Sequence, residues 1–162
     1  MNTIELLELL EDNARLTPEE IATMLQTDAG EVRRAIQELE KNKTIVKYMT
    51  LVNWEKAGEE KVSALIEVRI TPQRDVGFDA VARRICRFPE VRSVRLMSGA
   101  YDLAVFIEGR TMREVSHFVA TKLATIEGVV STTTHFALKT YKQDGVMMED
   151  GEEEDRRLMV TP

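Results

Sequence analysis

The chain is poor in cysteine and has no surplus of positive charge, and both features limit the classes of protein and of binding site that the sequence can form. Its 162 residues include 1 cysteine, Cys86, which excludes an internal disulfide framework and any zinc site built from several cysteines. We expect this thiol to be buried among its apolar neighbours. No apolar run approaches the roughly 18 to 20 residues of a membrane span, and the acidic amphipathic N-terminus is unlike a signal peptide. The sequence therefore predicts a cytoplasmic protein without a membrane segment.

Motifs of catalysis and cofactor binding are also missing. The sequence has no Gly-rich phosphate loop, no Ser/His/Asp order and no paired metal ligands. Its 2 histidines, His117 and His135, lie beside Phe118 and Phe136 without neighbouring Asp, His or Cys clusters, so we expect hydrogen-bonded or solvent-facing side chains. Nothing in the sequence requires catalysis, a metal or a cofactor.

Charge divides the chain into three segments, and its length allows two small domains. The formal net charge is -6, with 7 Lys+Arg and 11 Asp+Glu in residues 1–58, 13 and 10 in residues 59–142, and 2 and 7 in residues 143–162. We predict a DNA-binding domain over residues 1–58, a second domain over residues 59–142 and an acidic flexible tail over residues 143–162. The tail is either a solvated end or a competitor of DNA for the basic helix.

Residues 17–47 predict a helix-turn-helix followed by a wing. Thr17 with Glu20, and Asp28 with Glu31, match the pattern in which a side chain caps a helix and an acidic residue follows three positions later. Apolar residues then recur at helical spacing. A further helix over residues 3–13 would complete a three-helix core, and the β-branched residues of 44–52 predict a strand.

Polar side chains on the second helix of this motif form the candidate DNA-binding face. Such side chains hydrogen-bond base edges or phosphates in a major groove. A DNA-binding domain usually presents net positive charge, whereas residues 1–58 are acidic overall, so we expect modest affinity that several copies make useful. Two short helices with a polar face also occur in proteins that never contact nucleic acid. The candidate residues are Asp28, Glu31, Arg33, Arg34, Gln37, Lys43 and Lys47.

The second domain predicts the element order strand, helix, strand, strand, helix, strand. This βαββαβ order is that of a ferredoxin-like fold, in which two helices cover one face of an antiparallel four-stranded sheet, so the fold class is α+β. Hydrophobic residues on both faces of the strands predict that two copies pack together. The expected strands are 62–70, 91–97, 103–107 and 129–141, and the expected helices are 78–88 and 111–126.

The loop from Met97 to Asp102 is the candidate small-molecule site. Gly99 has no Cβ, so it can take a positive φ and let a ligand approach the backbone. Neighbouring amides could receive an α-carboxylate, and the Asp102 carboxylate could accept hydrogen bonds from an α-ammonium. Those groups are the two ends of a free amino acid. The same residues also suit a plain hairpin turn.

Together these features resemble the Lrp/AsnC family of transcription regulators. The resemblance covers residues 1 to about 142 and implies an N-terminal winged helix-turn-helix joined to a C-terminal ligand-sensing domain. The matching motifs are LEDNARLT at 10–17, Ile21-Ala22, the spacing of Val32, Ile36 and Leu39-Glu40, IVKY at 45–48, FPEV at 88–91, SGAYD at 98–102, and Gly128-Val129 with Thr132 and Thr134.

The resemblance also implies where an effector binds. In relatives, the loop corresponding to 97–102 and residues of the last strand line a pocket between dimers. This implies effector contacts by Gly99, Ala100, Tyr101 and Asp102, with Thr132 or Thr134 facing them, while Met97 either joins them or belongs to the core. The chain departs from the family at Asp28, Ala35 and Thr44, where Ser, Arg and Gly are common; without that arginine, Arg33 and Arg34 must supply the DNA contacts.

The predicted function is a sequence-specific DNA-binding transcription regulator that responds to an amino acid or a related small molecule. Its partners would be a double-stranded DNA operator, the effector and further copies of itself, as a homodimer that assembles into tetramers or octamers. Two alternatives stay open. One is an enzyme of the same two-domain layout that resembles sirohaem decarboxylases, and the other is an amino-acid-sensing module that has lost DNA affinity.

Overall fold

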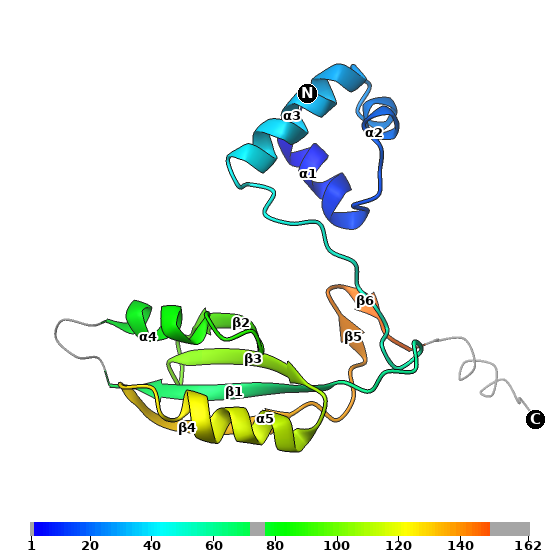
Figure 1. Cartoon of the computed structure of the whole chain (residues 1–162). Coiled ribbons are helices and arrows are strands. Elements are labelled where there is room, and N and C mark those ends of the chain that lie inside the picture. Colours follow the sequence, from blue (N-terminus) through cyan, green and yellow to red (C-terminus); the bar gives the residue numbers. More distant parts are fainter. Residues whose placement is uncertain (1, 72–76, 150–162) are drawn as a thin grey trace, which may run out of the picture. The chain divides into compact units, whose positions relative to one another are not determined.

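A computed structural model describes residues 2–71 and 77–149 of the chain, which divides into two compact units (Figure 1). The first unit ends at Val52 and the second begins at Asn53, ahead of the predicted junction between residues 58 and 59. Residues 150–162, most of the predicted acidic tail, lie outside the described residues. Within the described part of the chain, every helix is too short or too polar to cross a membrane.

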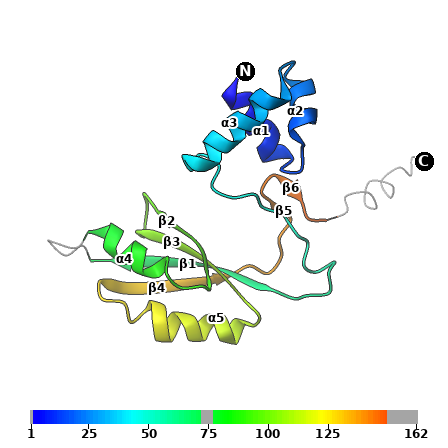
Figure 2. The ribbon, with the colours of Figure 1, turned by 45° about the horizontal axis from the view of Figure 1, so that its top comes forward.

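The first unit is a bundle of three helices, as the sequence predicts (Figure 2). Each helix begins after a side chain that accepts a hydrogen bond from a free amide of the first turn, namely Asn2, Thr17 and Asp28. The helices are α1 (Thr3–Asp12), α2 (Pro18–Met24) and α3 (Ala29–Lys41). Their buried core consists of Leu6, Leu10, Ile21, Ala22, Val32 and Leu39.

The segment after α3 differs from the prediction, because residues 44–52 form no strand. Lys43 takes a left-handed conformation with φ 65°, and the Ile45 amide donates to the Leu39 carbonyl at 2.9 Å, which ends the helix. Beyond this point the β-branched residues find no neighbouring strand within the described chain. A strand needs a hydrogen-bonded partner whatever its propensity, so these residues have no regular secondary structure and are largely exposed.

The second unit has the predicted βαββαβ order and an antiparallel four-stranded sheet. The strand order is β2-β3-β1-β4, so β3 lies between β1 and β2, as in a split βαβ arrangement. The elements are β1 (Val62–Ile70), α4 (Phe78–Ile85), β2 (Val91–Leu96), β3 (Leu103–Gly109), α5 (Met112–Phe118), the π-helix η1 (Val119–Leu123) and β4 (Val129–Phe136).

Both helices pack on the same face of this sheet. Alternate residues of β1 from Ala64 to Ile70 are buried, and they share one hydrophobic cluster with Val81 and Ile85 of α4. The same cluster contains Phe118 of α5 and residues of η1. The other face of the sheet carries the intervening residues, and no helix among the described residues of this unit covers it.

The end of the second unit differs from the prediction. The last sheet strand stops at Phe136, and a separate hairpin follows, formed by β5 (Lys142–Gln143) and β6 (Val146–Met147). Asp144 and Gly145 connect them with φ values of 46° and 83°, the two positive values that a tight hairpin turn requires. Residues 143–147, which the sequence analysis assigned to the flexible tail, therefore belong to this hairpin.

The cysteine is also placed differently from the expectation, because Cys86 is exposed rather than buried. It is the residue at which α4 ends, directly after the buried Ile85. One helical step turns a side chain by about 100°, so the residue after Ile85 points away from the sheet. Apolar neighbours in the sequence therefore misled the prediction.

Candidate DNA-binding helix and effector loop

The candidate DNA-binding helix α3 begins with two residues that serve the helix itself. One Asp28 carboxylate oxygen accepts hydrogen bonds from the amides of Gly30 and Glu31, at 2.8 and 3.1 Å. The Glu31 carboxylate accepts from the Thr27 hydroxyl at 2.7 Å, and this hydrogen bond holds the pKa of Glu31 below its ordinary value. Both predicted residues thus fix where α3 starts, which sets the direction of the side chains that follow.

Arg33 is held against the neighbouring helix. Its guanidinium forms an ion pair with Glu19, in the first turn of α2, and both side chains are about half exposed. The adjacent Glu20 completes the cap of α2 by accepting from the Thr17 amide at 2.7 Å, and the Thr17 hydrogen bonds lower the pKa of Glu20. Arg33 keeps further N–H donors, because a guanidinium has five. The sequence analysis missed Glu19, which lies 14 positions before its partner.

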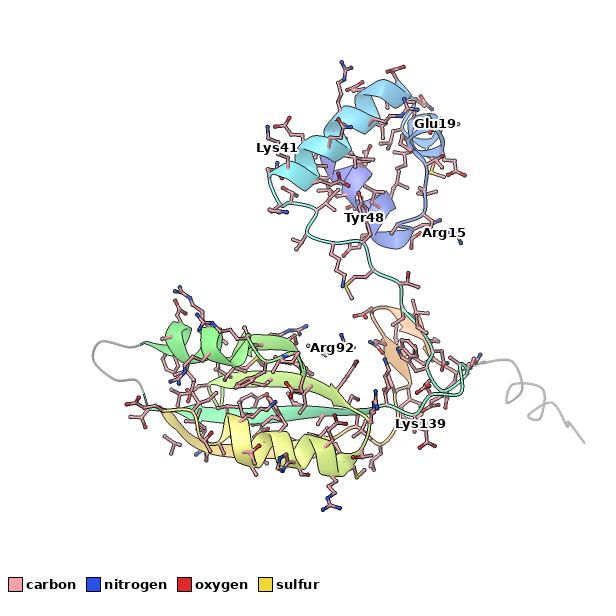
Figure 3. All side chains as sticks on the ribbon, viewed as in Figure 1. Arg15, Glu19, Lys41, Tyr48, Arg92 and Lys139 are labelled. Carbon is pink, nitrogen blue, oxygen red and sulfur yellow. The ribbon has the colours of Figure 1, made fainter. Side chains whose placement is uncertain are left out.

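The remaining candidate residues share the outer surface of the first unit. Arg34 and Gln37 are exposed on α3, whereas Val32 and Leu39 of the same helix are buried. Lys41 in the last turn adds a further positive charge, and Figure 3 shows it at the opposite end of the unit from Glu19. The exposed Lys43 and Lys47 belong to the segment after α3.

A tyrosine side chain connects the segment after α3 to the helix by a hydrogen bond. The Tyr48 hydroxyl donates to a carboxylate oxygen of Glu40 at 2.9 Å. Partial burial raises the pKa of Tyr48, and the hydrogen bond to Glu40 raises it further. The tyrosine therefore stays protonated and keeps this contact, so that the chain carrying Lys43 and Lys47 stays close to the end of α3.

The candidate effector loop, residues 97–102, is tied to β1 by Asp102. The Asp102 amide donates to the Val68 carbonyl at 3.0 Å, and its carboxylate accepts from the Ile70 amide at 2.7 Å. The register of β1 against β4 shifts between Arg69 and Ile70, and such a shift interrupts the hydrogen bonds between the strands. The Asp102 carboxylate gives the Ile70 amide a partner at this point. The loop is closed by the Met97 amide, which donates to the Asp102 carbonyl at 2.8 Å.

The centre of this loop is open. A Cβ on Gly99 would meet nothing within 4 Å, and Ala100 is exposed. Gly99 does not adopt the positive φ that the sequence analysis allowed for, so the backbone conformation does not demand glycine there. Met97 is 39% exposed and Tyr101 is half-buried. The loop thus combines exposed backbone with two larger side chains.

The two threonines of β4 lie at different distances from the loop. Thr132 is paired with Val68, which is itself paired with Leu103, the residue after the loop. Two strand spacings of about 4.8 Å therefore separate Thr132 from Leu103. Thr134 is paired with Ile66, two pairs further along the strand and away from the loop. The structure brings Thr132 into the row of residues beside the loop and leaves Thr134 outside it.

The two histidines belong to different elements, His117 to α5 and His135 to β4. Both are exposed, as expected, and His135 lies 3.3 Å from a carboxylate oxygen of Glu67 on the uncovered face of the sheet. Throughout the described residues, no group of three or more His, Cys, Asp or Glu side chains is close enough to hold a metal ion.

A helix-turn-helix with basic residues on its outer helix, joined to a ferredoxin-like domain with an open loop, defines a class of two-domain regulators. Comparisons with known proteins agree. A family model for a winged helix-turn-helix DNA-binding domain matches residues 2–46, and a model for the Lrp/AsnC ligand binding domain matches residues 63–147. The chain belongs to the Lrp/AsnC family, and it is a transcription regulator with a DNA-binding and a ligand-binding domain.

Individual relatives support the same conclusion. An uncharacterized HTH-type transcriptional regulator of Bacillus subtilis, YugG, is 51% identical over 98% of this chain and 95% of its own. A transcriptional regulator of Neisseria meningitidis, solved as an L-Met complex, has a TM-score of 0.71 and 27% identity, with 87% of this chain and 90% of that chain covered. Escherichia coli AsnC shares the fold, with a TM-score of 0.67, 20% identity and coverages of 85% and 91%.

Proposed function

We propose that the outer face of α3 binds a double-stranded DNA operator and that a free amino acid adjusts this binding. The observation that supports the DNA contact most directly is the division of α3 into two faces. Val32 and Leu39 are buried in the core, while Arg33, Arg34 and Gln37 are exposed on a helix whose start is fixed by Asp28. These are the side-chain types that contact phosphates and base edges.

We propose the loop of residues 97–102 as the effector site. Its exposed backbone suits an α-carboxylate, and the second oxygen of Asp102 is available for an α-ammonium while the first holds the Ile70 amide. The L-Met bound to the Neisseria meningitidis relative supports an amino acid as the ligand class. Thr132 is the residue of β4 that we place near this site, and Thr134 is the less favourable candidate.

The assembly that we propose is a homodimer, which joins others into a tetramer or octamer. The uncovered face of the sheet has an apolar centre made of Leu65, Ala104 and Phe106, with Phe106 covered by the Arg95 guanidinium at 5.4 Å from its ring centroid. Polar and charged side chains surround this centre. A small apolar patch with a polar rim is suited to a symmetric contact between two copies.

DNA binding is tested by an electrophoretic shift of the region upstream of the gene. We expect Arg33→Ala with Arg34→Ala to abolish the shift in a folded protein, and each lost phosphate contact to reduce the salt slope by about 0.9. The matched control is Arg83→Ala with Arg84→Ala, which removes the same charge from α4. Equal shifts for both double variants would contradict the assignment, and porphyrin uptake by an unshifted protein would favour the enzyme alternative.

The effector site is tested with two substitutions at one position. Asp102→Asn keeps an oxygen that accepts from the Ile70 amide but loses the negative charge, whereas Asp102→Ala loses both. We expect both variants to bind operator without an effector, and both to lose the response to L-methionine or to a pool of amino acids. A normal response of Asp102→Asn would place the ammonium contact elsewhere, because this variant lacks the carboxylate that the ammonium is proposed to contact.

A further inference from the structure

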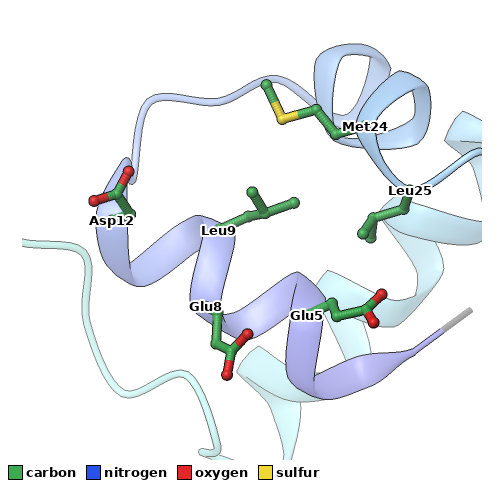
Figure 4. A pocket seen from close by; sticks show the side chains of 6 residues that line it. All are labelled: Glu5, Glu8, Leu9, Asp12, Met24 and Leu25. Atoms are coloured by element: carbon green, nitrogen blue, oxygen red, sulfur yellow. The ribbon is translucent and has the colours of Figure 1, made fainter.

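A groove of about 410 Å³ lies on the first unit, on a surface that the proposed DNA contact does not use (Figure 4). Leu9 of α1 faces Met24 and Leu25 at the end of α2, and carboxylates follow α1 along the groove. No residue of α3 lines it. The lining residues are Glu5, Glu8, Leu9, Asp12, Met24 and Leu25.

Glu5 lies in the first turn of α1, where a negative charge is favourable, but the charges further along this groove are unfavourable for the helix. α1 contains four acidic residues and no Lys or Arg. Glu5, Glu8 and Asp12 follow each other at spacings of three and four, where like charges repel, and Asp12 adds a negative charge at the negative end of the helix dipole. Within the described residues these three carboxylates have no ion pair or side-chain hydrogen bond. The unit itself therefore gains little from the carboxylates beyond the first turn of α1.

The apolar part of the groove is also more exposed than folding requires. Met24 is 55% exposed, although Ile21 and Ala22 of the same helix are buried in the core. Leu9 and Leu25 pack against the edge of that core and are only partly buried. A flexible thioether beside two leucines makes an adaptable apolar contact surface. The groove thus combines an apolar strip with one row of negative charge.

We propose that this groove is the docking site of a partner protein that presents a basic amphipathic helix. Its apolar side chains would contact Leu9, Met24 and Leu25, and its Lys and Arg side chains would lie beside the carboxylates of α1. DNA does not fit the same surface, because phosphates and carboxylates repel each other. Since α3 does not line the groove, the partner could be bound while α3 contacts an operator.

The test uses the full chain and a synthetic helical peptide with leucines along one face and lysines along the other. Fluorescence anisotropy of the labelled peptide should show saturable binding with one peptide per chain. We expect the triple variant Glu5→Gln, Glu8→Gln and Asp12→Asn to weaken peptide binding about tenfold or more. Met24→Gln alone should also weaken peptide binding. These side chains lie at the surface of the groove, and the far-UV circular dichroism should be unchanged.

The matched control removes the same charge elsewhere, by Glu55→Gln, Glu59→Gln and Glu60→Gln in the second unit. It should leave peptide binding within about twofold of the wild type, since only bulk charge changes. Equal weakening by both triple variants, or none by either, would overturn the proposal. A change in sedimentation caused by Met24→Gln without peptide would also overturn it, because the groove would then be a contact between copies of this chain.

Discussion

The two units differ in how much core supports their functional residues. The buried cluster of the first unit contains Leu6, Leu10, Ile21, Ala22, Val32 and Leu39, whereas the cluster of the second unit contains 14 buried residues from the sheet and its helices. The candidate DNA contacts are side chains on the outside of a small helical bundle. The candidate effector contacts belong to a loop that a large sheet supports.

This difference decides which interactions position each site. In the first unit, the Asp28 cap and the ion pair of Arg33 with Glu19 orient α3, and Thr17 caps the neighbouring α2. In the second unit, Asp102 ties the loop to β1, because its carboxylate accepts from the Ile70 amide and its own amide donates to the Val68 carbonyl. We therefore expect the position of α3 to depend on surface charges, and the position of the loop to depend on the pairing of the strands.

Removing a core side chain should produce the largest difference in stability between the two units. Leu6→Ala leaves a cavity in the small core and should cost about 2–5 kcal/mol, a large share of what so small a domain possesses. Ile66→Ala removes a similar volume from the larger core. Calorimetry should show that Leu6→Ala, but not Ile66→Ala, lowers the melting temperature of the first unit. A shift of both transitions by either variant would mean that the units unfold together.

The next largest effect should be a difference in how two glycines of the second unit tolerate substitution by alanine. Gly128 has φ +93°, and a Cβ there would lie 3.3 Å from a methyl group of Val81, so Gly128→Ala should destabilise the unit by about 1–2 kcal/mol from the conformation alone. Gly99→Ala meets open space and should leave stability unchanged. Urea unfolding measures both. An unstable Gly99→Ala would show that the loop needs glycine for folding, which would weaken its assignment as a ligand site.

Local features of the sequence predicted local features of the structure well. Thr17 and Asp28 each cap the helix that was expected to start after them, because a cap involves only neighbouring residues. The strand expected over residues 62–70 likewise appears as β1 with the same bounds. These elements place both candidate sites in the chain, on α3 and in the loop before β3.

Contacts between distant residues could not be predicted in the same way. The bond between Asp102 and Ile70 spans 32 positions and depends on a shift in strand register, which no local pattern encodes. The Asp144-Gly145 turn did carry a local signal, since Asp-Gly is typical of hairpins. The acidic composition around it outweighed that signal in our interpretation, and the hairpin was assigned to the tail.

The capping residues of the first unit should also make its stability depend on pH. Glu20 has a pKa below its ordinary value of 4.5 because Thr17 donates hydrogen bonds to its carboxylate. A carboxyl group whose pKa is lowered by folding stabilises the folded state above its unfolded pKa, and this contribution is lost as the pH falls through the folded pKa. Glu20→Gln should therefore flatten the acid side of the stability profile, measured by thermal unfolding. Glu38→Gln is the control, and an equal effect of both would remove the cap from the explanation.

The smallest effect that we predict concerns the ion pair that restrains Arg33. An exposed pair contributes about 0.2–1 kcal/mol, a factor of roughly 1.4 to 5 in affinity. Glu19→Gln frees the guanidinium and removes a carboxylate near the DNA, so operator affinity should rise by such a factor at low salt. In that background Arg33→Ala should cost more affinity than it does in the wild type, which a double-mutant cycle measures. Strictly additive effects would show that Glu19 does not restrain Arg33 when DNA is bound, and the caps of α3 alone would then position the DNA-binding face.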